Sequence, residues 1–89
     1  MTEVRFEPRL GLLSLSGHAG AGEKGRDLVC AALSILAETA AALEGAETRR
    51  GQGWLVTRGD AEKLAVLAVG FRLLARDWPR HVRYEEESV

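Results

Sequence analysis

The sequence has few of the residues that form disulfide bonds or bind structural metal ions. It contains a single cysteine, Cys30, and two histidines, His18 and His81. One cysteine cannot form an internal disulfide bond, and one cysteine with two histidines is a poor set of ligands for structural zinc. We therefore expect no disulfide within the chain, no metal site and no other cofactor.

Long apolar runs are also missing. Residues 1–8 lack the basic flank and the apolar stretch of a signal peptide. No segment approaches the roughly 18 consecutive apolar residues that are needed to cross a membrane. We therefore expect a cytoplasmic protein with no membrane partner.

Neither sign of charge dominates the sequence. It has 12 Lys and Arg against 13 Asp and Glu, a formal net charge of −1. Such a chain has no overall field that attracts nucleic acid, so we expect no direct nucleic-acid binding. The hydrophobic content of 46% is typical of a globular protein, and 89 residues suffice for one core. These values predict one domain over residues 1–89.

The first third of the chain predicts two strands and a loop. Residues 2–7 alternate polar and apolar side chains, which places Val4 and Phe6 on one face of a strand that Pro8 ends. Residues 10–16 are more apolar and predict a second strand, paired with the first as a hairpin. Residues 17–25 include four glycines, so this stretch is expected to be a loop.

The middle of the chain predicts a helix and a further strand. Apolar residues recur at helical spacing over residues 27–44, where Asp27 is placed to cap the helix and Gly45 to end it. Residues 46–52 are polar and fit either an edge strand or a turn. Residues 53–58 have the β-propensity of a strand.

The last third predicts a second helix, capped by Asp60 and ended by Trp78 and Pro79. Residues 81–84 fit a short final strand, and the three glutamates at 85–87 are expected to be frayed and solvated. The order of elements predicts an α+β fold of two layers, in which two helices pack on one face of a mainly antiparallel sheet.

Cys30 is the most chemically interesting side chain. If Asp27 caps the helix, the sulfur of Cys30 lies in the first helical turn, where backbone N–H groups and the helix dipole stabilise a thiolate. The Asp27 carboxylate opposes that effect, so a partner base has to decide the outcome. His18 is the candidate, because the loop can fold back and bring its imidazole to the helix start. From the residues alone, a lone cysteine near an apolar helix is more simply interpreted as a small buried hydrophobe than as a catalytic residue.

Small side chains continue from Cys30 along the predicted helix. Ser34 lies one turn further on, and with Ala37 and Ala41 it forms a face that leaves room for a substrate backbone or another helix. The Ser34 hydroxyl is placed to donate either to the thiolate or to the backbone carbonyl of Cys30, and the second arrangement is the more common one in helices.

Two short motifs give the chain a family resemblance. Gly17, His18 and Ala19 are followed, after the glycine-bearing loop, by residues 27–34 with the sequence DLVCAALS. The motifs, their interval and their strand-to-helix context resemble the signature of the ribosomal-processing cysteine protease family known as Prp. The resemblance implies that Cys30 is the nucleophile and His18 the general base.

The resemblance also implies a substrate and a quaternary state. It implies an endopeptidase that removes the N-terminal extension of large-subunit ribosomal protein twenty-seven, cutting near aromatic residues and ahead of a small one. Gly17, Asp27 and Ser34 match motif positions beside the catalytic pair and are assigned supporting or substrate-binding roles. Members of the family are homodimers.

Two other functions are compatible with the same residues. One is a non-catalytic dimeric module that binds a ribosomal component and uses Cys30 as part of its core. The other is a thiol redox sensor, in which mild peroxide would oxidise Cys30. Reactivity of Cys30 toward an alkylating reagent at neutral pH argues against the first.

Overall fold

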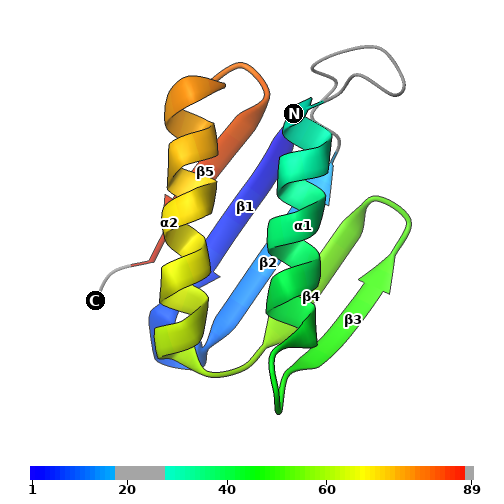
Figure 1. Cartoon of the computed structure of the whole chain (residues 1–89), viewed down its shortest axis with the longest axis vertical. Coiled ribbons are helices and arrows are strands. Elements are labelled where there is room, and N and C mark those ends of the chain that lie inside the picture. The colour runs from blue at the N-terminus through cyan, green and yellow to red at the C-terminus, as the bar shows by residue number, and fades with distance from the viewer. Residues whose placement is uncertain (18–27, 88–89) are drawn as a thin grey trace.

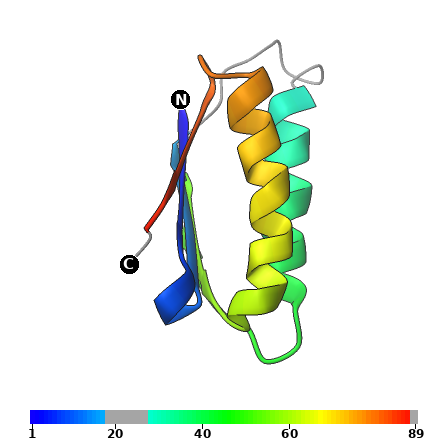
Figure 2. The ribbon, with the colours of Figure 1, turned by 90° about the vertical axis from the view of Figure 1, so that its left-hand side faces the viewer.

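Five strands form one sheet, and two helices cover one of its faces. The computed structural model describes residues 1–17 and 28–87. The strand order is β3-β4-β2-β1-β5, and every neighbouring pair is antiparallel except β1 with β5, which are parallel. Figures 1 and 2 show α1 and α2 side by side on the same face, so the predicted two-layer α+β fold is confirmed. The elements are β1 (Thr2–Glu7), a 3-10 turn (Pro8–Leu10), β2 (Leu12–Gly17), α1 (Leu28–Ala42), β3 (Glu47–Gly51), β4 (Trp54–Arg58), α2 (Ala61–Asp77) and β5 (Val82–Glu86).

The hairpin of β1 and β2 differs from the prediction in where its second strand begins. In β1 the predicted alternation is confirmed, since Val4 and Phe6 are both buried. The second strand was expected over residues 10–16, but Leu10 ends the 3-10 turn and Gly11 adopts a left-handed conformation with φ of 59°. A side chain at Gly11 would meet the Gly59 carbonyl oxygen at 2.3 Å. Gly11 therefore belongs to the turn, and β2 begins at the next residue, Leu12.

The helix boundaries follow local capping chemistry. The Asp60 carboxylate accepts hydrogen bonds from the backbone N–H groups of Glu62 (2.9 Å) and Lys63 (3.4 Å), which confirms it as the cap of α2. α2 ends at Asp77, directly before Trp78, as predicted. α1 ends at Ala42, two residues before the expected boundary. The predicted cap at residue 27 lies outside the described residues.

The polar residues after α1 form an edge strand. The sequence left residues 46–52 open between a strand and a turn, and β3 pairs with β4 along its whole length. The hydroxyls of Thr48 and Thr57 share a hydrogen bond of 2.7 Å across this pair. β3 therefore forms one edge of the sheet, on the side of the molecule where α1 lies (Figure 1).

The predicted fraying of residues 85–87 is wrong. β5 includes Glu85, and the backbone N–H of Glu87 donates to the carbonyl of Phe6 at 3.0 Å. The Arg5 guanidinium lies 3.7 Å from the Glu85 carboxylate and 3.1 Å from that of Glu87. Residues 85–87 thus lie beside the first strand and pair with Arg5, a residue from the other end of the chain.

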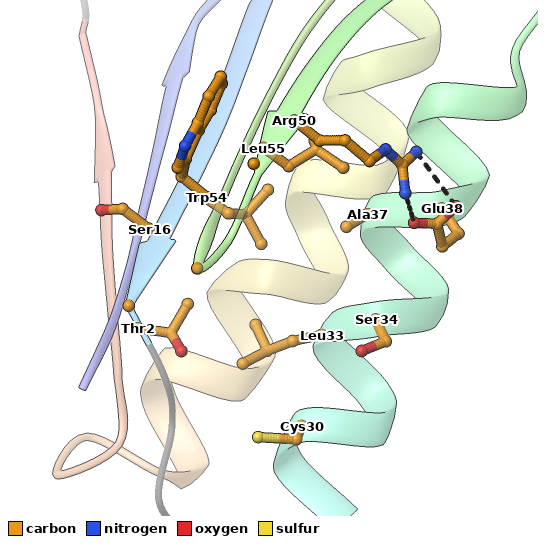
Figure 3. Close-up of a pocket in the computed structure, with 14 residues that line it drawn as sticks. Thr2, Ser16, Cys30, Leu33, Ser34, Ala37, Glu38, Arg50, Trp54 and Leu55 are labelled. Carbon is orange, nitrogen blue, oxygen red and sulfur yellow. Dashed lines mark hydrogen bonds and ion pairs between the residues drawn. The ribbon is translucent and has the colours of Figure 1, made fainter.

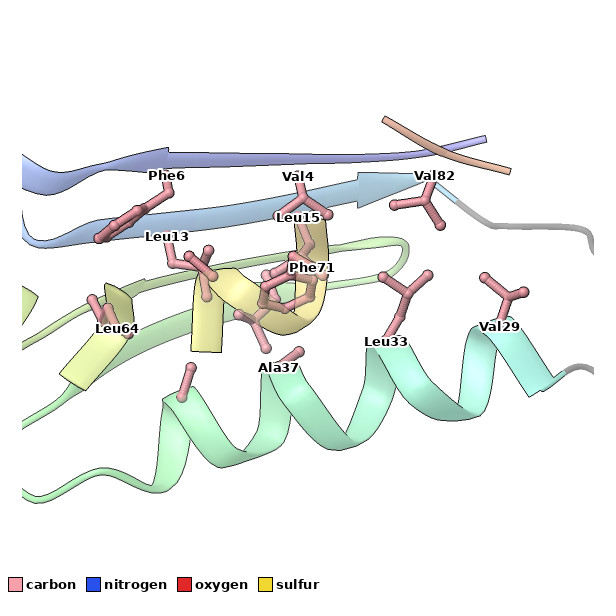
Figure 4. Packing of buried hydrophobic residues seen from close by; sticks show 13 residues of the cluster. Val4, Phe6, Leu13, Leu15, Val29, Leu33, Ala37, Leu64, Phe71 and Val82 are labelled. Carbon is pink, nitrogen blue, oxygen red and sulfur yellow. The ribbon is translucent and has the colours of Figure 1, made fainter. Parts of the chain in front are cut away.

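The core lies between the sheet and the two helices, and Figure 4 shows side chains from both layers meeting there. Phe71 of α2 is fully buried in this cluster. The helices approach closely at Gly70, where a side chain would meet the Leu36 methyl groups at 2.9 and 3.0 Å. Within the described residues, no helix is long and apolar enough to cross a membrane. The buried apolar residues are Val4, Phe6, Leu13, Leu15, Val29, Leu33, Ala37, Ala40, Leu55, Leu64, Ala68, Phe71 and Val82.

Candidate active site

A cavity of about 260 Å³ lies between α1 and the strands that face its first half. One side is formed by successive turns of α1, and the other by the start of β1, the end of β2 and the β3–β4 hairpin (Figure 3). The cavity is therefore bounded by regular elements and can receive a chain lying along the helix. The residues that line it are Thr2, Leu15, Ser16, Gly17, Cys30, Leu33, Ser34, Ala37, Glu38, Arg50, Gly51, Gly53, Trp54 and Leu55.

Cys30 lies at one end of this cavity. It is the third residue of α1, as the sequence predicted, and its half-buried side chain packs partly against the core. Figure 3 shows the sulfur pointing from the helix toward the facing strands. The first N–H groups of an α-helix have no partner within the helix, so the sulfur lies near donors that stabilise negative charge. Unlike a fully enclosed core cysteine, Cys30 can be reached by a molecule in the cavity.

The wall beyond Cys30 consists of small and apolar side chains. Ser34 lies one turn along α1 and, like Ala37, lines the cavity, so this part of the predicted small-residue face is confirmed. Leu33 and Leu55 add an apolar surface, the first from α1 and the second from β4. The cavity next to the thiol is thus shaped for an uncharged segment of chain.

Gly17 brings the end of β2 to the same cavity. Its φ is 91°, and a side chain there would lie 2.3 Å from the Met1 carbonyl oxygen. Its backbone N–H donates to the Gly53 carbonyl at 2.9 Å, which ties β2 to the β3–β4 turn. Both observations explain the glycine physically, because no other residue fits this backbone and this space.

The structure thus brings together three of the five residues singled out in the sequence. Gly17, Cys30 and Ser34 all line one cavity, although they come from β2 and from two turns of α1. His18 and Asp27 lie outside the described residues. His18 follows Gly17 directly in the chain, and Asp27 directly precedes the first residue of α1.

The two charged residues of the lining were among those missed by the sequence analysis. Glu38 of α1 and Arg50 of β3 form two hydrogen bonds across the outer side of the cavity, one of them 3.3 Å long (Figure 3). The hydrogen bond and charge of Glu38 raise the pKa of Arg50 above its ordinary value. The sequence did indicate that Glu38 lies near the site, because it is two turns beyond Cys30 on the same side of the predicted helix.

An accessible thiol at a helix start, beside the uncharged part of a cavity, fits a thiol enzyme that attacks a carbonyl group. Residues 1–83 match the family model described as cysteine protease Prp. The chain therefore belongs to the Prp family and is a cysteine protease. No curated protein sequence matches it.

Solved structures share the fold over nearly the whole chain. An essential ribosomal processing protease Prp from S. aureus, in complex with a covalently linked product peptide, is 18% identical with a TM-score of 0.73. The alignment covers 98% of this chain and 100% of that one. The same S. aureus protease with a substrate peptide has a TM-score of 0.66 at 18% identity, with coverages of 98% and 100%. SMU.848 from Streptococcus mutans is 24% identical, with a TM-score of 0.67 and coverages of 99% and 93%.

Proposed function

We propose that residues 1–89 form a single-domain endopeptidase that removes the N-terminal extension of large-subunit ribosomal protein twenty-seven. In this proposal Cys30 is the nucleophile, His18 is the general base, and Gly17, Asp27 and Ser34 support them. The observation that carries the proposal is the side chain of Cys30, which reaches a cavity from the first turn of α1. The S. aureus relatives, described as ribosomal processing proteases in complex with peptides, support the substrate class.

The proposed chemistry uses a thiolate and an imidazole. His18 accepts the thiol proton of Cys30, and the thiolate sulfur attacks the carbonyl carbon of the cleaved bond. The carbonyl oxygen becomes an oxyanion, which backbone N–H groups at the start of α1 are suited to stabilise. Collapse of this intermediate breaks the C–N bond, and the amine leaves with the proton held by His18. A thioester remains, which water hydrolyses as His18 accepts a proton from that water.

The proposal extends to the state of the protein in the cell. We place it in the cytoplasm as a homodimer that does not bind nucleic acid directly. Large apolar side chains on the outer surface of the helices support a partner, since Ile35 and Val66 are about two-thirds exposed or more. A second copy covering such side chains would remove apolar surface from water and add to the stability of a small core.

The substrate is tested with ribosomal protein twenty-seven from the same organism. We expect the purified protein to shorten the extended form to a single product, whose new N-terminus is mapped by mass spectrometry. A form with the extension scrambled in sequence, equal in length and composition, is the matched control and should stay intact. Binding of the extended form without any cleavage would contradict the proposal and favour a non-catalytic ribosome-associated module.

A further inference from the structure

The cavity has a charged end opposite the thiol. Glu38 of α1 and Arg50 of β3 meet there, with side chains 54% and 51% exposed. The two guanidinium nitrogens of Arg50 that bind the carboxylate reach across from an edge strand to a helix (Figure 3). This pair therefore forms part of the wall that a chain lying in the cavity would pass.

The distance from the thiol to this pair can be expressed in substrate residues. Cys30, Ser34 and Glu38 follow one another at intervals of four along α1, so Glu38 lies about 12 Å beyond Cys30 along the helix axis. An extended peptide covers about 3.3 Å per residue. A substrate in this groove thus reaches Glu38 and Arg50 about three or four residues from the bond that Cys30 attacks.

The other described residues that line the cavity carry no charge. Leu15, Leu33, Ala37 and Leu55 are apolar, while the remaining residues are small, hydroxyl-bearing or, in Trp54, aromatic. A charged substrate side chain would therefore meet formal charge at the Glu38–Arg50 end of the described cavity. There it would face an acid and a base that already neutralise each other.

We propose that Glu38 and Arg50 form a subsite that contacts the substrate side chain three or four residues from the cleaved bond. This inference rests on the proposed proteolytic function. In the intact pair the two charges cancel, so the subsite discriminates little between acidic and basic side chains. Removing one charge leaves the other exposed to the substrate. The subsite then carries a net charge, positive without the Glu38 carboxylate and negative without the Arg50 guanidinium.

The test pairs enzyme variants with substrate variants. Peptides spanning the cleaved bond carry Ala, Glu or Lys, one position at a time, from four residues before the bond to four after it. Glu38→Gln leaves Arg50 charged and should favour Glu over Lys by about 2- to 5-fold in kcat/KM at the third or fourth position on one side. Arg50→Gln should reverse that preference.

Further variants distinguish a subsite from a general effect on structure. The double variant Glu38→Gln, Arg50→Gln should return the Glu-to-Lys ratio to near that of the wild type. Arg72→Gln removes a similarly exposed ion pair, which joins α2 to Glu86 of β5 and does not line the cavity. It should leave the ratio unchanged at every position. The changes should appear mainly in KM, because the subsite is remote from the reacting carbonyl.

Two results would overturn the inference while leaving the protease assignment intact. One is active cleavage by both single variants with the wild-type Glu-to-Lys ratio at all eight positions. The other is a reversal of preference only at the residues that adjoin the cleaved bond. A wild-type protein that cleaves none of the peptides would instead contradict the proposed function itself, and the subsite with it.

Discussion

Replacing Cys30 by alanine is expected to lower kcat/KM for the extended substrate by at least about 10³-fold, because the variant has no atom that can form the thioester. His18→Ala should cost about 10²- to 10⁴-fold, the usual contribution of a positioned general base. The rates are measured by chromatography of the released N-terminal fragment. The double variant should be no slower than Cys30→Ala, since the two side chains act as a unit.

These rates can be compared only if both variants are folded. Cys30 is half-buried at the edge of the core, so the variants are compared with the wild type by circular dichroism and urea unfolding. Folded Cys30→Ala protein that cleaves at the wild-type rate would rule out a Cys30 nucleophile. An undiminished rate in folded His18→Ala protein would remove only the general base from the proposed mechanism.

Phe71→Ala is expected to lower the free energy of unfolding by about 3–5 kcal/mol, the usual cost of truncating a buried phenylalanine. The ring is fully buried between α2 and the sheet, and the whole chain has only 89 residues. Because small domains are stable by about 5–15 kcal/mol, the loss is a large share of the total. The measurement is the midpoint and slope of urea unfolding.

Leu73→Ala provides the matched control on the same helix. Leu73 is 45% exposed, so its truncation should cost well under half as much as that of Phe71. Equal losses in the two variants would contradict the described packing of α2 on the sheet. If Phe71→Ala is unfolded without urea, its midpoint is read in a stabilising osmolyte alongside both other proteins.

Local patterns predicted the local features of the fold. The alternation in residues 2–7 identified the buried face of β1, and Asp60 identified the start of α2, because both depend on neighbours in the sequence. The error at residues 85–87 has a long-range cause. Three adjacent glutamates indicate a solvated tail, whereas Arg5, some 80 residues earlier, pairs with Glu85 and Glu87. The parallel pairing of β1 with β5 is equally invisible to local patterns.

In the candidate site, too, local patterns predicted some residues and missed those that depend on long-range contacts. Spacing along one helix was enough to relate Cys30 to Ser34, and a motif added Gly17. Arg50 could not be found in this way, because it enters the cavity from a segment that fitted a turn as well as a strand. The roles of His18 and Asp27 remain predictions.

The central claim, that Cys30 attacks the substrate carbonyl, is tested most directly by affinity labelling. A chloromethyl ketone is built on the substrate sequence up to the cleaved bond, and the labelled residue is located by mass spectrometry of digested protein. The account predicts one thioether adduct on Cys30, formed much faster than with a ketone of scrambled sequence and absent from Cys30→Ala. Labelling at another residue, or at the same rate with the scrambled ketone, would contradict it.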